Sequence, residues 1–123
     1  AMTGGQMAPT TLPGQKTETS PYGRDVEAQG YPTLGPEMVS AITREGAYVA
    51  RGTVANLRQL KRFIKKALEN QIAGRGFSFV EALSLCPTNW RTNAEQTWKF
   101  VEEDMAQYFK VGELKAPGEK KEG

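Results

Sequence analysis

The chain of 123 residues contains no histidine and a single cysteine. Without histidine, Ser-His-Asp and Cys-His catalysis and histidine-ligated metals are excluded within this chain. One cysteine excludes an internal disulfide, and the first residues lack the basic-then-apolar order of a secretory signal, so we expect a cytoplasmic protein. Apolar runs stay far below the roughly 20 residues of a transmembrane helix, and we expect no membrane span.

The sequence also lacks a large excess of either positive or negative charge. The formal net charge is +2, from 16 basic and 14 acidic residues. This is far from the single-sign excess of a nucleic-acid-binding protein, so we expect no nucleic-acid partner. The 38% hydrophobic and 24% charged residues are typical of a globular protein. If the chain belongs to an enzyme, something other than this chain must supply the reactive group. We therefore assign no catalytic residue.

Composition divides the chain into three predicted parts: a loop region over 1–35, an α/β body over 36–114 and a charged tail over 115–123. The first part is rich in Gly, Pro, Thr and Ser and shows neither a helical nor a strand period. Such a long irregular stretch is typically either a functional binding loop or disordered, and both interpretations stay open.

Hydrophobic periodicity predicts the regular elements of the body. We expect helices at 36–44 and from Leu57 to Ile72, the second ended by Gly74, and strands at 47–50 and 76–84. A capping box formed by Thr92 and Glu95 predicts a final helix. Its expected apolar face comprises Ala94, Trp98, Val101, Met105 and Phe109.

The order α-β-α-β-α predicts an α/β fold with a partial parallel sheet, in which the second strand is central because both its faces are apolar. Two strands cannot form a stable sheet with two apolar faces. We therefore expect further strands from other polypeptide, so that the chain is a fragment or an obligate subunit.

Paired glycines near the start form the first candidate site. They let main chain approach a ligand closely, and Thr3, Gly4 and Gly5 can donate hydrogen bonds to diphosphate oxygens. A flexible turn is the alternative. Residues 2–7 also match the opening of a common expression tag, although the continuation from Ala8 to Gln15 belongs to no such tag.

The second candidate is Cys86, directly after the second predicted strand. Open α/β sheets place ligands at the carboxyl edge of their strands, although a buried thiol that packs as a small hydrophobe is the alternative.

Other side chains carry structural expectations. The basic stripe from Arg58 to Lys66 could dock an acidic protein or nucleic acid, but most such faces are merely solvated. Glu81, in an apolar strand, is expected to form an ion pair. Trp90 and Trp98 are expected in the core.

The glycine-containing motif near the start and the motif around Cys86, together with the residues between them, resemble the beta subunit of 2-oxoacid:ferredoxin oxidoreductases. The resemblance is strongest to the forms acting on 2-oxoglutarate or branched-chain 2-oxoacids. The resemblance rests on Met-Thr-Gly-Gly-Gln-Met-Ala-Pro-Thr-Thr from Met2, Tyr-Gly-Arg-Asp from Tyr22 and Leu-Ser-Leu-Cys-Pro-Thr-Asn-Trp from Leu83. It extends to Leu114 and implies the carboxy-terminal part of a thiamine-diphosphate-binding fold.

The resemblance implies that Thr3, Gly4, Gly5 and Gln6 lie beside thiamine diphosphate. It also implies that Cys86 is the last of four thiolates on a [4Fe-4S] cluster. The family's magnesium ligands precede this motif, so no residue here is assigned to magnesium. All three cofactors would require the missing amino-terminal half.

The implied reaction is oxidative decarboxylation of a 2-oxoacid to acyl-coenzyme A, with electrons passed to ferredoxin. The implied partners are alpha and further subunits, and we expect the chain to be inactive alone. Two alternatives stay open: a thiamine enzyme fragment without a cluster, and a non-enzymatic binding module that uses the basic helix over 58–66.

Overall fold

The computed structural model describes residues 3–118, which form two compact units. Unit 1 comprises the start of the chain to Leu34 together with 85–108, and unit 2 comprises 35–84 together with the chain from Phe109 onward. The residues beyond 118, which belong to the predicted tail, lie outside the described part.

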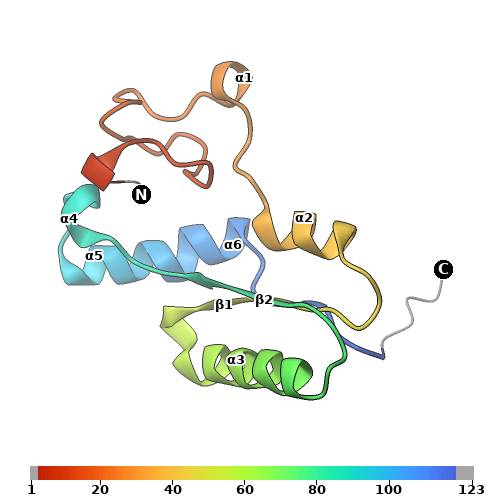
Figure 1. The fold of residues 1–123 in the computed structure, drawn as a ribbon. Helices are drawn as coiled ribbons and strands as arrows, with labels where there is room; N and C mark the ends of the chain where they lie inside the picture. The colour runs from red at the N-terminus through yellow and green to blue at the C-terminus, as the bar shows by residue number, and fades with distance from the viewer. Residues whose placement is uncertain (1–2, 119–123) are drawn as a thin grey trace. The chain divides into compact units, whose positions relative to one another are not determined.

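Unit 2 is an α/β body around a three-stranded sheet of order β2-β1-β3. Its strands are β1 (Tyr48–Thr53), β2 (Ser78–Leu83) and β3 (Gly112–Lys115). Helix α2 (Gly35–Ile42) and helix α3 (Leu57–Ile72) contact the sheet from opposite faces (Figure 1). The short 3-10 turn η2 (Val54–Asn56) links β1 to α3. The α/β class predicted from the sequence is confirmed.

The sheet differs from the prediction in two respects. β1 and β2 pair in parallel as expected, but β3 pairs antiparallel with β1, so the sheet is mixed. Among the described strands β1 is central and β2 lies at an edge, so the prediction of a central second strand was wrong. Every residue of β1 is buried, whereas β2 is mostly half-buried.

A buried arginine joins the layers of unit 2. Arg51, fully buried in β1, donates to both carboxylate oxygens of Glu37 at 2.7 Å and to Glu81 at 2.6 Å. Its guanidinium also lies 5.3 Å from the ring centre of Phe109. The expectation that Glu81 forms an ion pair is confirmed. Hydrogen bonds from Arg51 hold the pKa of Glu37 below its ordinary value of 4.5, despite partial burial.

Unit 1 contains η1 (Thr3–Gly5), α1 (Val26–Gln29), α4 (Pro87–Trp90), and a helix built from α5 (Ala94–Lys99), a π-helical segment η3 (Phe100–Met105) and α6 (Ala106–Tyr108). The capping box of α5 is formed by Asn93 and Gln96, one position later than the predicted Thr92 and Glu95. Val101 is buried, but Trp98 is 41% exposed, so its predicted core position was wrong.

The irregular stretch of unit 1 is organised around Arg24, which is 6% exposed. Among the residues that the structure describes, its guanidinium donates to main-chain carbonyls and to no carboxylate; the acceptors include Thr11 at 2.7 Å, Pro9 at 2.9 Å and Tyr31 at 3.1 Å. Its Nε donates to the carbonyl of Gly30 at 2.9 Å. Because the planar guanidinium group has five N–H donors, this one side chain can bind carbonyls at both ends of the loop over 8–31 and hold the two ends together.

No helix of the described residues is long and apolar enough to cross a membrane.

Replacing Arg51 with Met should lower the free energy of unfolding by about 3–5 kcal/mol, because two partly buried carboxylates lose their cation. Chemical denaturation measures the change. Lys66→Met, which removes the more exposed 2.8 Å pair with Glu113, is the control and should cost about 1 kcal/mol or less. Equal effects of the two substitutions would contradict this account.

The same pair predicts a pH dependence. The pKa of Glu37 is lowered on folding, so its stabilising contribution is fully present above the unfolded value near 4.5 and is lost as the pH falls through the folded value. Denaturation midpoints measured on both sides of pH 4.5 should fall in acid, and should fall less steeply for Arg51→Met. An unchanged slope in that variant would sink the assignment.

Substituting Arg24 with Lys should open the loop over 8–31, because an ammonium has only three donors and cannot reach both ends. We expect a loss of at least about 2 kcal/mol in stability and faster amide exchange within the loop. Mass spectrometry of deuterium uptake measures the exchange. Exposed Arg44, changed to Lys, is the control and should leave the loop's protection unchanged.

Candidate functional site

The η1 turn presents two consecutive glycines in the left-handed region, with φ of 74° at Gly4 and 73° at Gly5. L-residues adopt such angles only at a cost, so the turn requires glycine. Gly4 is exposed, and a Cβ built on it would meet nothing within 4 Å. The main chain at Gly4 is therefore open to close approach by a ligand.

Neighbouring main chain holds this turn in place. The carbonyl of buried Gly5 accepts a hydrogen bond of 3.0 Å from the amide of Glu18. The amide of Met7 donates to Thr19 Oγ1 at 2.9 Å. The 17–20 segment is itself a closed turn, bridged between Thr17 and Ser20. The glycines thus stand on a supported loop rather than at a loose terminus.

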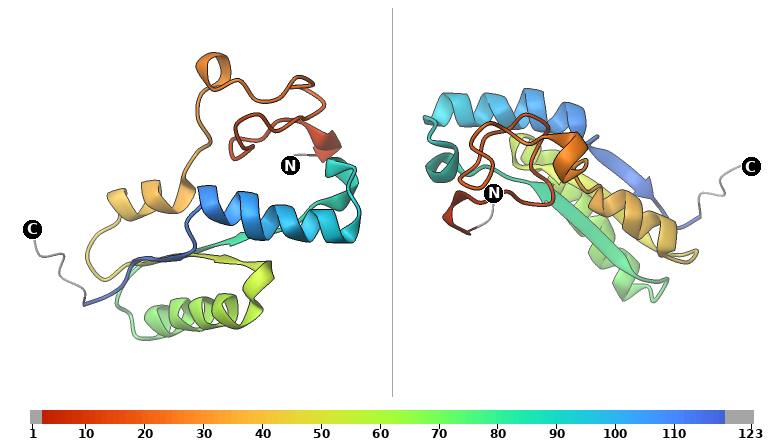
Figure 2. Two further views of the ribbon diagram at one scale, coloured as in Figure 1. Left: turned by 180° about the vertical axis from the view of Figure 1, so that it is seen from behind. Right: turned by 90° about the horizontal axis from the view of Figure 1, so that it is seen from above.

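The second predicted site residue, Cys86, lies in the same unit. It is half-buried, and its carbonyl accepts a hydrogen bond of 3.1 Å from the amide of Trp90, which closes α4. Helix α4 contacts η1, and both views of Figure 2 show the two segments side by side. Two motifs separated by some eighty positions in the sequence are therefore neighbours in space.

The remaining residues of the predicted site are less well defined by the structure. Gln6 is exposed, and the side chain of Thr3 lies outside the described part of the chain. Within the described residues no group of three or more His, Cys, Asp or Glu side chains could hold a metal ion. The described part of the chain can therefore offer one thiolate to a metal cluster but not a complete ligand set.

Sequence reasoning missed a pair of residues beside this site. Arg91 is a non-glycine residue with positive φ, 53°, directly after α4, and its guanidinium lies 2.5 Å from Glu18. The ion pair ties the end of α4 to the turn that supports Gly5. Neither its strained backbone nor its distant partner leaves a local sequence signal.

A cavity of about 310 Å3 lies beside this pair, lined by Lys16, Thr17, Glu18, Pro21, Trp90 and Arg91. Trp90 packs edge-on against Phe100, with ring centres 4.8 Å apart, which anchors α4 on the long helix of unit 1. The buried indole Nε1 has no hydrogen-bond partner among the described residues.

No family model and no solved structure matches the chain. Curated relatives do: a ketoisovalerate oxidoreductase subunit VorA of Methanothermobacter thermautotrophicus is 45% identical over 89% of this chain. A 2-oxoglutarate synthase subunit KorB of Methanothermobacter marburgensis is 40% identical over 99% of it, and one of Archaeoglobus fulgidus is 39% identical over 84%.

The matches cover 24% of that VorA and 40% and 35% of those KorB subunits, so the chain spans well under half of each relative's length. Each match nevertheless covers most of this chain. The chain belongs to the family of 2-oxoacid:ferredoxin oxidoreductase subunits.

Proposed function

We propose that this chain is part of the thiamine-diphosphate-binding beta subunit of a 2-oxoacid:ferredoxin oxidoreductase. The observation that carries the proposal is the left-handed turn at Gly4 and Gly5, exposed at Gly4 and in contact with the helix that follows Cys86. The names of the relatives, ketoisovalerate oxidoreductase and 2-oxoglutarate synthase, support a 2-oxoacid as the substrate.

The turn suits a diphosphate on two grounds. Consecutive N–H groups in this conformation form a concave donor surface that favours anions. The space beside Gly4 that a Cβ would occupy is open, so the anion can reach the main chain. In this proposal Thr3, Gly4, Gly5 and Gln6 orient the diphosphate end of thiamine diphosphate and carry out no proton transfer themselves.

The proposed overall reaction converts a 2-oxoacid and coenzyme A to acyl-coenzyme A and carbon dioxide. The bond between the carboxylate and the carbonyl carbon breaks, a thioester bond forms with release of the thiol proton, and two electrons leave for ferredoxin one at a time. Thiamine diphosphate, when bound, supplies the electron sink for the bond cleavage. This explains how a chain without histidine can belong to such an enzyme.

Cys86 is proposed as one thiolate ligand of a [4Fe-4S] cluster that receives these electrons. Its half-buried position, at the start of a helix that contacts the glycine turn, would put the redox centre close to the cofactor. The remaining thiolates and the magnesium ligands would come from other parts of the enzyme. Other subunits, ferredoxin and coenzyme A are its proposed partners, and the cytoplasm its proposed compartment.

The basic stripe on α3 gives less support to the alternative of a binding module. Lys66 is held by Glu113 at 2.8 Å, and Lys65 lies 3.6 Å from Glu69. Part of the stripe's charge is thus neutralised within unit 2. This is the behaviour of a solvated helix face rather than of a surface that awaits a polyanion.

Gly4→Ala tests the role of the turn. In the assembled enzyme, the added methyl group enters the space proposed for the diphosphate, so we expect thiamine diphosphate to bind at least about tenfold more weakly. Equilibrium titration of the enzyme with the cofactor measures its dissociation constant.

Gly30→Ala is a matched control. Gly30 has the same φ of 74° and the same open space, but lies on the far part of the Arg24 loop. Both variants should lose about 1–2 kcal/mol of stability from the left-handed backbone. Only Gly4→Ala should lose affinity for the cofactor, and equal affinities for the two variants would refute the proposed contact.

Cys86→Ser tests the cluster. In the assembled enzyme we expect a loss of iron and of the electron paramagnetic resonance signal of the reduced cluster, because a hydroxyl is a poor ligand for iron-sulfur clusters. Ser84→Ala changes an exposed neighbour and should retain both. Full iron content and an unchanged signal in Cys86→Ser would instead favour a thiamine enzyme in which Cys86 only packs.

A further inference from the structure

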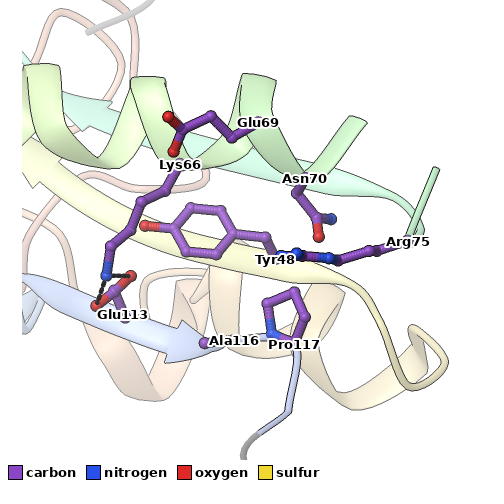
Figure 3. A pocket seen from close by; sticks show the side chains of 8 residues that line it. All are labelled: Tyr48, Lys66, Glu69, Asn70, Arg75, Glu113, Ala116 and Pro117. Carbon is purple, nitrogen blue, oxygen red and sulfur yellow. Dashed lines mark hydrogen bonds and ion pairs between the residues drawn. The ribbon is translucent and has the colours of Figure 1, made fainter. Parts of the chain in front are cut away.

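Among the described strands, the two edges of the unit 2 sheet differ in how they are protected. Strand β3, at one edge, has four residues, and its pairing with β1 shifts register between Val49 and Ala50. It carries Glu113, whose carboxylate Lys66 holds at 2.8 and 2.9 Å (Figure 3), and Pro117 follows shortly after its end. Short length, irregular pairing, charged side chains and proline are features that discourage a further strand.

Strand β2, at the other edge, pairs with β1 in one register over all six of its residues and is covered on both faces. On one face Val80 packs against the buried core around Tyr48 and Phe63. Successive side chains of a strand point to opposite faces, and on the second face Glu81 accepts a hydrogen bond of 2.6 Å from Arg51. Helices α2 and α3 both contact the strand. Such two-sided cover is typical of a strand inside a parallel sheet rather than at its edge.

The outward-facing groups of β2 follow from its register. The carbonyl of Phe77 accepts a hydrogen bond of 2.9 Å from the amide of Tyr48 in β1. In a parallel pair, alternate residues of a strand bond to the same neighbour, so the odd-numbered residues of β2 face β1. The N–H and C=O groups of Val80 and Ala82 therefore point to the edge. Among residues 3–118 no main-chain hydrogen bond involves these groups, and Ala82 is exposed.

This edge requires a partner with a row of main-chain donors and acceptors, and an extended strand has such a row. The orientation follows from the cover on both faces, because sheets with helices on both faces are typically parallel. The chain spans well under half the length of its relatives, so a subunit of their length has further polypeptide to supply the strand. A second copy of this chain fits less well, because a twofold axis at this edge would pair β2 with itself antiparallel.

We propose that the edge of β2 pairs in parallel with a strand from the part of the same subunit that lies outside this chain. The N–H and C=O groups of Val80 and Ala82 bond to that strand. The proposal rests on the proposed function only in taking the chain as part of a longer subunit, and it uses none of the cofactor contacts.

Amide hydrogen exchange in the assembled enzyme, resolved to single residues by mass spectrometry, tests the pairing. The amides of Val80 and Ala82 should exchange about as slowly as those of Phe79 and Glu81, which face β1, and at least about a hundredfold more slowly than an unprotected amide. Exchange of Val80 and Ala82 at the unprotected rate, with Phe79 and Glu81 still protected, overturns the proposal. Titration of the same sample with thiamine diphosphate separates the two proposals, because normal cofactor binding beside fast exchange refutes the strand alone.

Photo-crosslinking from the two ends of β2 tests the source and the direction of the strand. Phe77 and Ala82 are exposed, and each is replaced in the assembled enzyme with the photoreactive p-benzoylphenylalanine. Both should attach to one segment of the same subunit outside this chain, with the attachment from Phe77 nearer the amino end of that segment. The same replacement at exposed Lys61, on α3, is the control and should not attach to that segment. Attachment to a second copy of β2, to another subunit, or in the reverse order contradicts the assignment.

Discussion

The guanidinium of Arg24 is the interaction on which the candidate site depends. A stretch rich in glycine and proline has few apolar side chains to bury. Without another source of stabilisation, the conformational entropy of the chain would keep such a stretch from adopting one structure. Arg24 replaces the missing core with hydrogen bonds to carbonyls at both ends of the loop. A buried cation that pairs with no carboxylate of the described residues is costly, and it persists because several carbonyl dipoles surround it. The supported loop can then present the glycines at residues 4 and 5 in a conformation that an unsupported terminus would not hold.

Arg51 has the corresponding role in unit 2 with a different set of partners. Two carboxylates and the ring of Phe109 surround it, so its charge has partners in both the sheet and the helix layers. Both arginines use the planar, multi-donor guanidinium to join segments that are distant in sequence. The two compact units thus have separate internal supports.

The sequence predicted those parts of the fold that depend on local patterns. The amphipathic helix from Leu57 to Ile72, the short helix near 36–44 and the parallel strand pair all follow from periodicity. Strand β3 was missed because its four residues alternate charged and apolar side chains too briefly to produce a signal, and its pairing is nonlocal. The exposed position of Trp98 shows that an apolar stripe over a π-helical segment does not keep a single face.

For the site, the structure places η1 beside α4. The assignment of these two segments to cofactor binding stays a prediction. The roles of Arg24, Arg51 and the pair between Glu18 and Arg91 could not be predicted, because each depends on partners brought together only by the fold.

The most direct test of the central claim is an experimental structure of the assembled enzyme with thiamine diphosphate bound. The account predicts a diphosphate oxygen about 3 Å from the main-chain nitrogen of Gly4 or Gly5. A diphosphate bound elsewhere, with the glycine turn in contact only with protein, would contradict it.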